Sequence, residues 1–211
     1  MKKTLMIAAL GLMALAAKAQ SDNYNRVYIG YAPIMATDDD IWDETFHGLN
    51  IGYTKGISLN GNAPLYLEVG ANVQFNMYTE KEYDYSKHDL TLTMLQAQVP
   101  VNITYLIMLG DSGITLAPYA GLSAKFNILG KQKLENPDNG NSHEVDFFSK
   151  DDMGDFAAKR FQVGMQLGAN ITFGENWNLG IGYQRDLTSY MEEDPHKLMF
   201  HGIVATVGFN F

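Results

Sequence analysis

Residues 160–174 read RFQVGMQLGANITFG, a stretch in which apolar side chains alternate with polar or small ones. The apolar side chains stand at the odd positions: Phe161, Val163, Met165, Leu167, Ala169, Ile171 and Phe173. The even positions hold Gln162, Gly164, Gln166, Gly168, Asn170 and Thr172. Successive side chains of a β-strand point to opposite faces, so this period of two predicts a strand with one apolar and one polar face.

The same alternation recurs along the chain. It is regular in residues 65–78 and 203–211, and weaker in residues 26–35, 46–59, 90–109, 114–129 and 177–187. Together with residues 160–174, these segments predict eight strands. The alternation slips by one position around Met94 and Leu95, which suggests a β-bulge or a misplaced strand boundary.

Strand length and the composition of the polar face separate two classes of β-protein. Several alternations run 11–15 residues, whereas strands of globular sheets usually have about 5–6 and a tilted membrane strand has about 9–11. The polar face is rich in Gly, Asn, Gln, Thr and Ser, which is typical of a narrow, packed interior. We therefore predict an all-β fold, an eight-stranded antiparallel up-and-down transmembrane β-barrel with lipid outside and a closed polar lumen.

A barrel with lipid outside and a polar lumen inside assigns alternate side chains either to the lipid or to the lumen. The predicted lipid-facing residues are Leu67, Val69, Phe75, Phe161, Val163, Met165, Leu167, Ile171, Phe173, Val207, Phe209 and Phe211. The predicted structural network of the lumen comprises Glu68, Asn72, Gln74, Lys125, Gln162, Gln166, Gln184 and Asp186. Because buried charges need partners, we expect Lys125 to pair with Glu68 or Asp186. Arg185 has outward parity, where its guanidinium could meet lipid phosphates or simply extend to the interface.

The first 19 residues have the three parts of a secretory signal peptide. Lys2 and Lys3 precede an apolar stretch at 5–17, and Ala17-Lys18-Ala19 supplies a cleavage pattern. We therefore expect a signal peptide over residues 1–19 and a barrel domain over residues 20–211. The chain has no cysteine, which excludes a disulfide framework, and its formal charge of −9 argues against a nucleic-acid partner.

The connections between predicted strands alternate in length. Residues 60–64, 110–113 and 174–176 have the composition of tight turns, whereas residues 36–45, 79–89, 130–158 and 188–197 are longer and acidic. This asymmetry is typical of barrels in the outer membrane of Gram-negative bacteria and predicts periplasmic termini and extracellular long loops. Phe173, Trp177, Phe209 and Phe211 are expected near the periplasmic rim, and Phe126, Phe161 and Tyr190 near the outer one.

The loops offer little for catalysis or metal binding. Their acidic runs are interpreted as solvated surface, with divalent-cation binding as the alternative. The five histidines show no metal-ligand spacing. His143, Asp146 and Ser149 resemble a hydrolase set, but their spacing of three provides neither a nucleophile elbow nor an oxyanion hole. We predict no catalytic residue, no metal site and no cofactor.

Four segments resemble the PorT-like outer-membrane β-barrel family. They are QAQVPVNITY at 96–105, APYAGL at 117–122, and the glycine-rich pair FQVGMQLG at 161–168 and LGIGY at 179–183, followed by Leu187 and Thr188. Gln98 stands where the family often has Glu. The terminal Phe209-Asn210-Phe211 also resembles the aromatic-ended last strand that outer-membrane assembly machinery recognises. The resemblance implies an eight-stranded outer-membrane barrel but no single activity.

The sequence thus predicts a non-enzymatic outer-membrane barrel with a structural or surface-interaction role. Its expected partners are outer-membrane lipids, lipopolysaccharide and the assembly machinery, together with an unidentified surface ligand of the loops. Eight strands leave an interior just wide enough for side chains, which argues against a general diffusion pore. Three alternatives stay open: a secretion-accessory component, an outer-membrane enzyme acting on lipid or peptide, and a soluble lipocalin-like binder.

Overall fold

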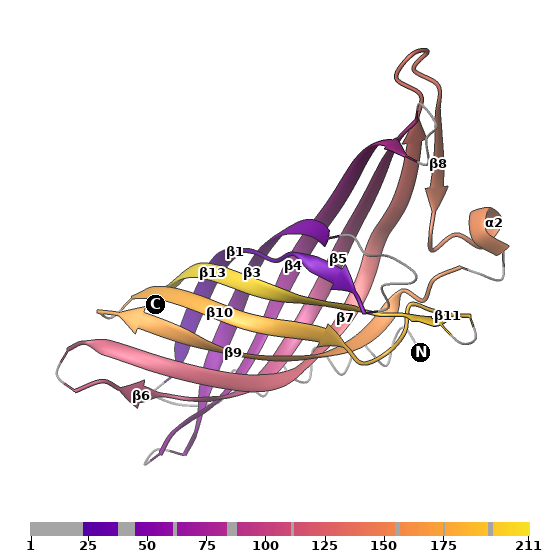
Figure 1. The fold of residues 1–211 in the computed structure, drawn as a ribbon. Coiled ribbons are helices and arrows are strands. Elements are labelled where there is room, and N and C mark those ends of the chain that lie inside the picture. The colour runs from indigo at the N-terminus through magenta and orange to yellow at the C-terminus, as the bar shows by residue number, and fades with distance from the viewer. Residues whose placement is uncertain are drawn as a thin grey trace.

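A computed structural model describes residues 23–37, 45–60, 63–83, 88–110, 112–154, 157–174, 176–193 and 196–211. The predicted signal peptide lies outside these residues. None of the described helices is long and apolar enough to cross a membrane. The fold consists almost entirely of antiparallel strands that curve around a common axis (Figure 1).

The main sheet closes on itself. Its strand order is β1-β13-β10-β9-β7-β5-β4-β3, and β3 pairs in turn with β1. The bounds of these strands are Tyr24–Tyr31 (β1), Thr45–Asn60 (β3), Ala63–Tyr83 (β4), His88–Tyr105 (β5), Ile114–Glu135 (β7), Phe161–Phe173 (β9), Trp177–Asp186 (β10) and Phe200–Asn210 (β13). Sequential neighbours pair throughout, so the predicted eight-stranded up-and-down barrel is confirmed for the described residues.

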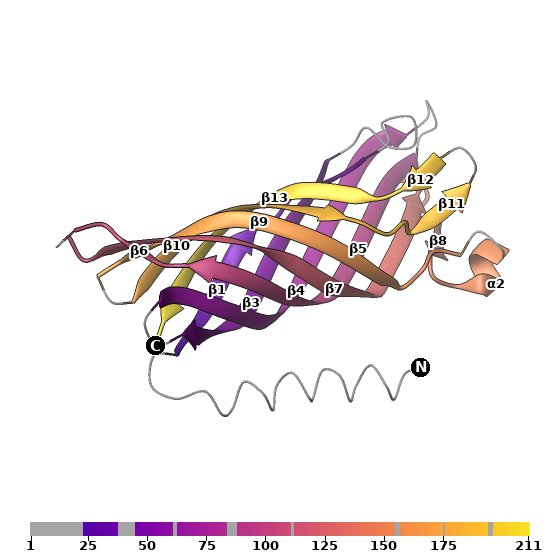
Figure 2. The same cartoon turned by 90° about the horizontal axis from the view of Figure 1, so that it is seen from below.

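Shorter elements complete or extend this wall. Strand β2 (Ile34–Ala36) continues β1 after Pro33 and pairs with both β3 and β13. Strand β6 (Ile107–Met108) pairs with β7, as does β8 (Ser142–Asp146). The helix α2 (Lys150–Met153) and the hairpin of β11 (Met191–Glu193) and β12 (His196–Leu198) lie at the other end of the barrel from β6 (Figure 2).

The two ends of the barrel differ. The end at which β1 begins, β3 ends, β4 begins and β13 ends is called the turn end here, and the opposite end the loop end. At the loop end, β4, β5, β7 and β8 extend beyond the other strands (Figure 1). The prediction of simple loops at 79–89 and 130–158 was therefore wrong, because strands continue through parts of both. Only Leu134 is apolar in residues 131–135, so the period of two is lost where the strand continues.

The predicted irregularity near Met94 and Leu95 is confirmed, but the extra residue lies on the neighbouring strand. Leu95 pairs with Leu129 and Gln96 pairs with Asn127, so Ile128 of β7 forms the bulge. Strand β5 itself alternates without a break. The alternation of apolar residues shifts by one position in the sequence because the inward side chains change from polar to apolar toward the loop end.

Glycines allow the strands of the barrel to pack closely at a few positions. A Cβ on Gly168 would lie 2.4 Å from the backbone oxygen of Ile181 and 2.7 Å from the Cα of Gly182. At Gly182 a Cβ would instead lie 2.3 Å from the Tyr119 hydroxyl. These two glycines are direct cross-strand partners in β9 and β10, so they make room in the lumen for the Tyr119 side chain.

Candidate functional site: a polar lumen beneath an apolar closure

The predicted lumen residues line the inside of the barrel. Glu68, Asn72, Gln74, Lys125, Gln162, Gln184 and Asp186 are at most 7% exposed, and Gln166 is half-buried. None of the predicted lipid-facing residues is buried. Leu167 is 48% exposed and Phe211 62%, so large apolar side chains stand on the outer surface. The described barrel is thus polar inside and apolar outside, the reverse of a soluble protein.

Among the described residues, two ion pairs lie inside the barrel. Lys125 Nζ is 2.8 Å from Asp186 Oδ1, so Lys125 takes Asp186 rather than Glu68 as its partner. Glu68 instead pairs with Arg26, whose Nη2 lies 2.8 Å from Glu68 Oε1. The Tyr24 hydroxyl also donates to this carboxylate. Arg26 was not among the predicted lumen residues, although its position in the first alternating segment gives it the inward parity of Tyr28 and Gly30.

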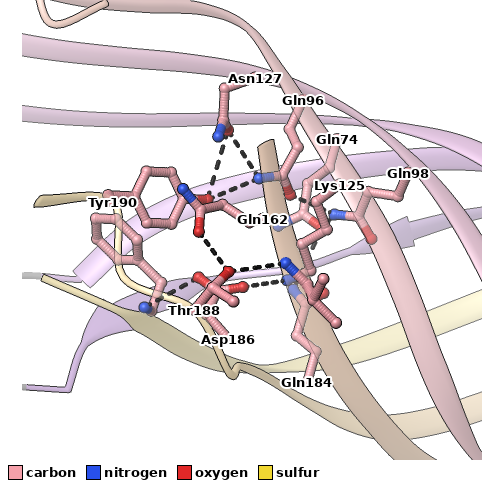
Figure 3. Close-up of polar contacts among 12 residues, drawn as sticks. Gln74, Gln96, Gln98, Lys125, Asn127, Gln162, Gln184, Asp186, Thr188 and Tyr190 are labelled. Atoms are coloured by element: carbon pink, nitrogen blue, oxygen red, sulfur yellow. Dashed lines mark hydrogen bonds and ion pairs between the residues drawn. The ribbon is translucent and has the colours of Figure 1, made fainter. Parts of the chain in front are cut away.

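Around the Lys125–Asp186 pair, amide side chains bridge strands of the barrel (Figure 3). Gln74 of β4 accepts hydrogen bonds from Gln98 of β5 at 3.0 Å and from Gln184 of β10 at 3.2 Å. Gln96 donates to Asn127 at 2.8 Å and to the Tyr190 hydroxyl at 2.7 Å. Because carboxamides both donate and accept, this network satisfies polar groups across a lumen too narrow for bulk water.

The lumen is not polar along its whole length, which corrects the prediction of a polar interior throughout. At the loop end an apolar cluster fills it, called the mouth cluster here. Its members are Ile34, Ala36, Phe46, Leu90, Leu92, Met94, Tyr190, Leu198 and Phe200. The sequence placed Leu90, Leu92 and Met94 in a strand, but parity alone did not show that apolar side chains turn inward there.

Aromatic rings form the centre of the mouth cluster. The centroid of the Phe200 ring lies 5.1 Å from that of Tyr190 and 5.7 Å from that of Phe46, and both pairs are edge to face. The centroids of the Phe46 and Tyr78 rings are 5.9 Å apart. Tyr190 is 3% exposed, so its expected place among rim aromatics facing the headgroups was wrong. Burial, and secondarily the charge of Asp186, raises the pKa of Tyr190 well above its ordinary value. The neutral hydroxyl joins the apolar closure to the amide network beneath it.

The described loop-end surface carries several ion pairs and a cation–π contact. Lys131 pairs with Glu144, and Lys133 Nζ lies 2.5 Å from Glu135 Oε2. The guanidinium of Arg160 lies 4.8 Å from the centre of the Phe148 ring. Among the described residues, no group of three or more His, Asp or Glu side chains could hold a metal ion. The acidic residues at 38–40 and 43–44 lie outside the described part of the chain.

The rejected hydrolase set has local structural roles. Asp146 accepts a hydrogen bond from the backbone N–H of Phe148 at 2.8 Å, and Ser149 accepts one from the N–H of Asp152 at 3.3 Å. These are turn and N-cap contacts that shape the segment around α2.

A closed antiparallel barrel with an apolar exterior, a polar interior and short turns at one end is the architecture of an integral outer-membrane β-barrel protein. The chain belongs to the outer membrane protein beta-barrel domain family, whose sequence profile matches residues 4–211. The outer membrane is accordingly its location. No curated protein matches the sequence.

Several solved structures resemble this barrel. Ail of Yersinia pestis, in complex with the heparin analogue sucrose octasulfate, has a TM-score of 0.54 at 14% identity over 90% of this chain and 100% of that chain. Neisserial surface protein A has a TM-score of 0.43 at 14% identity, covering 90% and 98%. The outer membrane enzyme PagL has a TM-score of 0.45 at 10% identity, covering 87% and 97%. At these identities, the likeness to Ail shows the shared fold alone.

Proposed function

We propose that the protein is a non-enzymatic outer-membrane barrel with a structural or surface-interaction role. The observation that carries this proposal is the filled lumen. Amide side chains and two ion pairs occupy its middle, and the mouth cluster occupies its loop end. A solute crossing the barrel would have to displace buried, hydrogen-bonded side chains, so passage through the lumen is disfavoured. Any recognition of partners then falls to the loop end.

The proposal includes an orientation. The turn end and both termini of the mature chain face the periplasm, and the loop end faces the exterior. The regular contrast between short and long connections supports this assignment. Residues 1–19 act as the signal peptide, residues 20–211 form the barrel domain, and the last strand, β13 with Phe211, is read by the assembly machinery. The three-part N-terminal pattern and the aromatic final residues support these roles.

The outer surface of the barrel fits contact with lipids and lipopolysaccharide. Trp177 and Phe209 pack edge to face at 5.6 Å near the turn end, in the manner of an interfacial aromatic girdle. Arg185 stands eight residues further along β10, which places it ~20 Å higher in a strand tilted by about 40°. There it is the cross-strand partner of His201, whose ring lies 6.0 Å from Tyr183. This row suits a phosphate-bearing headgroup of the outer leaflet.

Within the broader family we assign the chain to the PorT-like barrels. The segments at 96–105, 117–122 and 161–183 that resemble this group occupy consecutive parts of β5, β7, β9 and β10. Pro100 of the first segment points into the lumen, where it is buried. A secretion-accessory role, suggested by the group name, would require a partner that binds outside the filled lumen.

Several measurements test the proposed function. Purified barrel reconstituted into planar bilayers should give no steady ion current, and folded protein should migrate differently from boiled protein on detergent gels. A deletion strain should show altered envelope integrity or surface binding, and its membranes should lose no hydrolytic activity toward lipids or peptides. A steady pore current in the bilayer would contradict the proposal, and so would a lipid- or peptide-modifying activity of the purified barrel.

A further inference from the structure

A small chamber lies within the polar lumen, on the turn-end side of the amide network. Its volume is about 60 Å³, and its walls include Arg26, Asn50, Glu68, Asn72 and Gln98. The Arg26–Glu68 ion pair and the amides Gln98 and Gln184 form part of this wall. The chamber is therefore lined by lumen residues and belongs to neither the mouth cluster nor the loop surface.

The chamber walls have hydrogen-bonding capacity that the described side chains do not use. Asn50 is 4% exposed, and its Oδ1 is buried without a hydrogen-bond partner among the described residues. Among the described residues, the hydrogen bonds of the Asn72 side chain are long, at 3.4 Å to Asn50 and 3.3 Å to the Tyr28 hydroxyl. Within the described residues, Arg26 donates to Glu68 alone, although a guanidinium has five N–H donors.

These properties select one kind of occupant. Apolar molecules are disfavoured, because they would leave the amide and guanidinium groups unsatisfied. An additional ion is disfavoured as well, because Arg26 and Glu68 neutralise each other and a third charge would have no partner. A cavity needs roughly 10–15 Å³ to hold one water molecule, so this volume of about 60 Å³ has room for more than one. Water both donates and accepts, and it therefore matches walls that contain both kinds of group.

We propose that this chamber is a binding site for a cluster of ordered water molecules that hydrate the Arg26–Glu68 pair and the Asn50 carboxamide. An ion pair hydrated in this way keeps part of its solvation inside the membrane, so the desolvation penalty of placing two charges there is reduced. The inference does not depend on the role of the loops. It would hold for a structural barrel or for a receptor.

Solution NMR of the full-length mature barrel in lipid nanodiscs tests the proposal directly. Cross-relaxation with water should be seen for the side-chain amide protons of Asn50 and Asn72. The matched control is Asn76, which is 2% exposed and whose Nδ2 donates to the Ala32 carbonyl at 2.9 Å. Its amide protons should show no such peaks. Absence of water peaks at Asn50 and Asn72 would overturn the proposal.

The variant Asn50→Leu provides an independent test, because hydrated and dry chambers predict opposite signs. In a hydrated chamber the substitution removes hydrogen bonds to water, and the urea midpoint of unfolding should fall by roughly 0.5 M. In a dry chamber it removes an unsatisfied carbonyl, and the midpoint should rise. A rise in a variant that keeps the folded gel mobility would overturn the proposal. If the variant does not fold, the NMR result on the unaltered chain decides.

Discussion

The Lys125–Asp186 pair allows a quantitative test of how the lumen is stabilised. The two side chains are 5% and 1% exposed and their charged atoms lie 2.8 Å apart. Asp186 also accepts the backbone N–H of Phe200 at 3.1 Å, so it links the polar lumen to the mouth cluster. Replacing one partner leaves the other as an uncompensated buried charge, which costs about 3–5 kcal/mol of folding free energy in buried pairs.

The expected values follow from these contacts. Lys125→Met and Asp186→Asn should each lower the free energy of unfolding by about 3 kcal/mol or more. The double variant leaves no charge behind, and the carboxamide oxygen introduced at position 186 can still accept from the Phe200 N–H, so it should lose only about 1–2 kcal/mol. The sum of the single losses should therefore exceed the loss in the double variant by several kcal/mol, the signature of direct coupling.

Urea unfolding of the barrel in lipid vesicles, followed by tryptophan fluorescence and gel mobility, measures these changes. Lys133→Met is the matched control, because the Lys133–Glu135 side chains are 43% and 44% exposed and such pairs contribute about 0–1 kcal/mol. If Lys125→Met cost as little as this control, the pair would be solvated through the lumen, and the reasoning from burial would be refuted.

Three further predictions address facing, close packing and the mouth cluster. Leu167→Arg should cost about 2–4 kcal/mol in the bilayer, with Gln166→Leu milder; the reverse ranking would contradict the assignment of faces. Gly168→Ala, whose Cβ would clash with backbone atoms, should lower the free energy of unfolding by about 1–3 kcal/mol. Gly180→Ala, whose Cβ meets side chains that can move, should lower it less, and equal urea midpoints for the two variants would refute this. The raised pKa of Tyr190 means that its stabilising contribution is complete below pH ~10 and declines above it, so Tyr190→Phe should weaken the alkaline loss of stability, and an unchanged pH profile would refute this.

The barrel was predictable from sequence because the two faces of each strand meet different environments, which requires apolar and polar side chains to alternate. Leu167 and Ile171 are exposed on the outer surface, whereas Asn170 is buried and Gln166 half-buried on the lumen side, so each strand records both environments in alternate residues. Inward parity also placed Lys125 and Asp186 on one surface. Lys125 pairs with Asp186 and not with Glu68 because of the stagger between strands around the closed sheet. The sequence of a single strand does not determine this stagger. Arg26 was missed because the first segment is short and its alternation is weak.

The mouth cluster escaped prediction for a different reason. The rule that polar side chains face inward is expected to hold where lipid surrounds the barrel wall. There the outward side chains must be apolar, and the alternate, inward side chains are polar and bond to one another. At the loop end Phe46, Leu92 and Phe200 are nevertheless inward and less than 4% exposed, so the lumen acquires a conventional apolar core. A single pattern of alternating polar and apolar residues cannot describe a strand whose inward side chains change from polar to apolar along its length. The lining of the lumen therefore changes from polar to apolar just below the loops, and this change closes the barrel at its proposed external end.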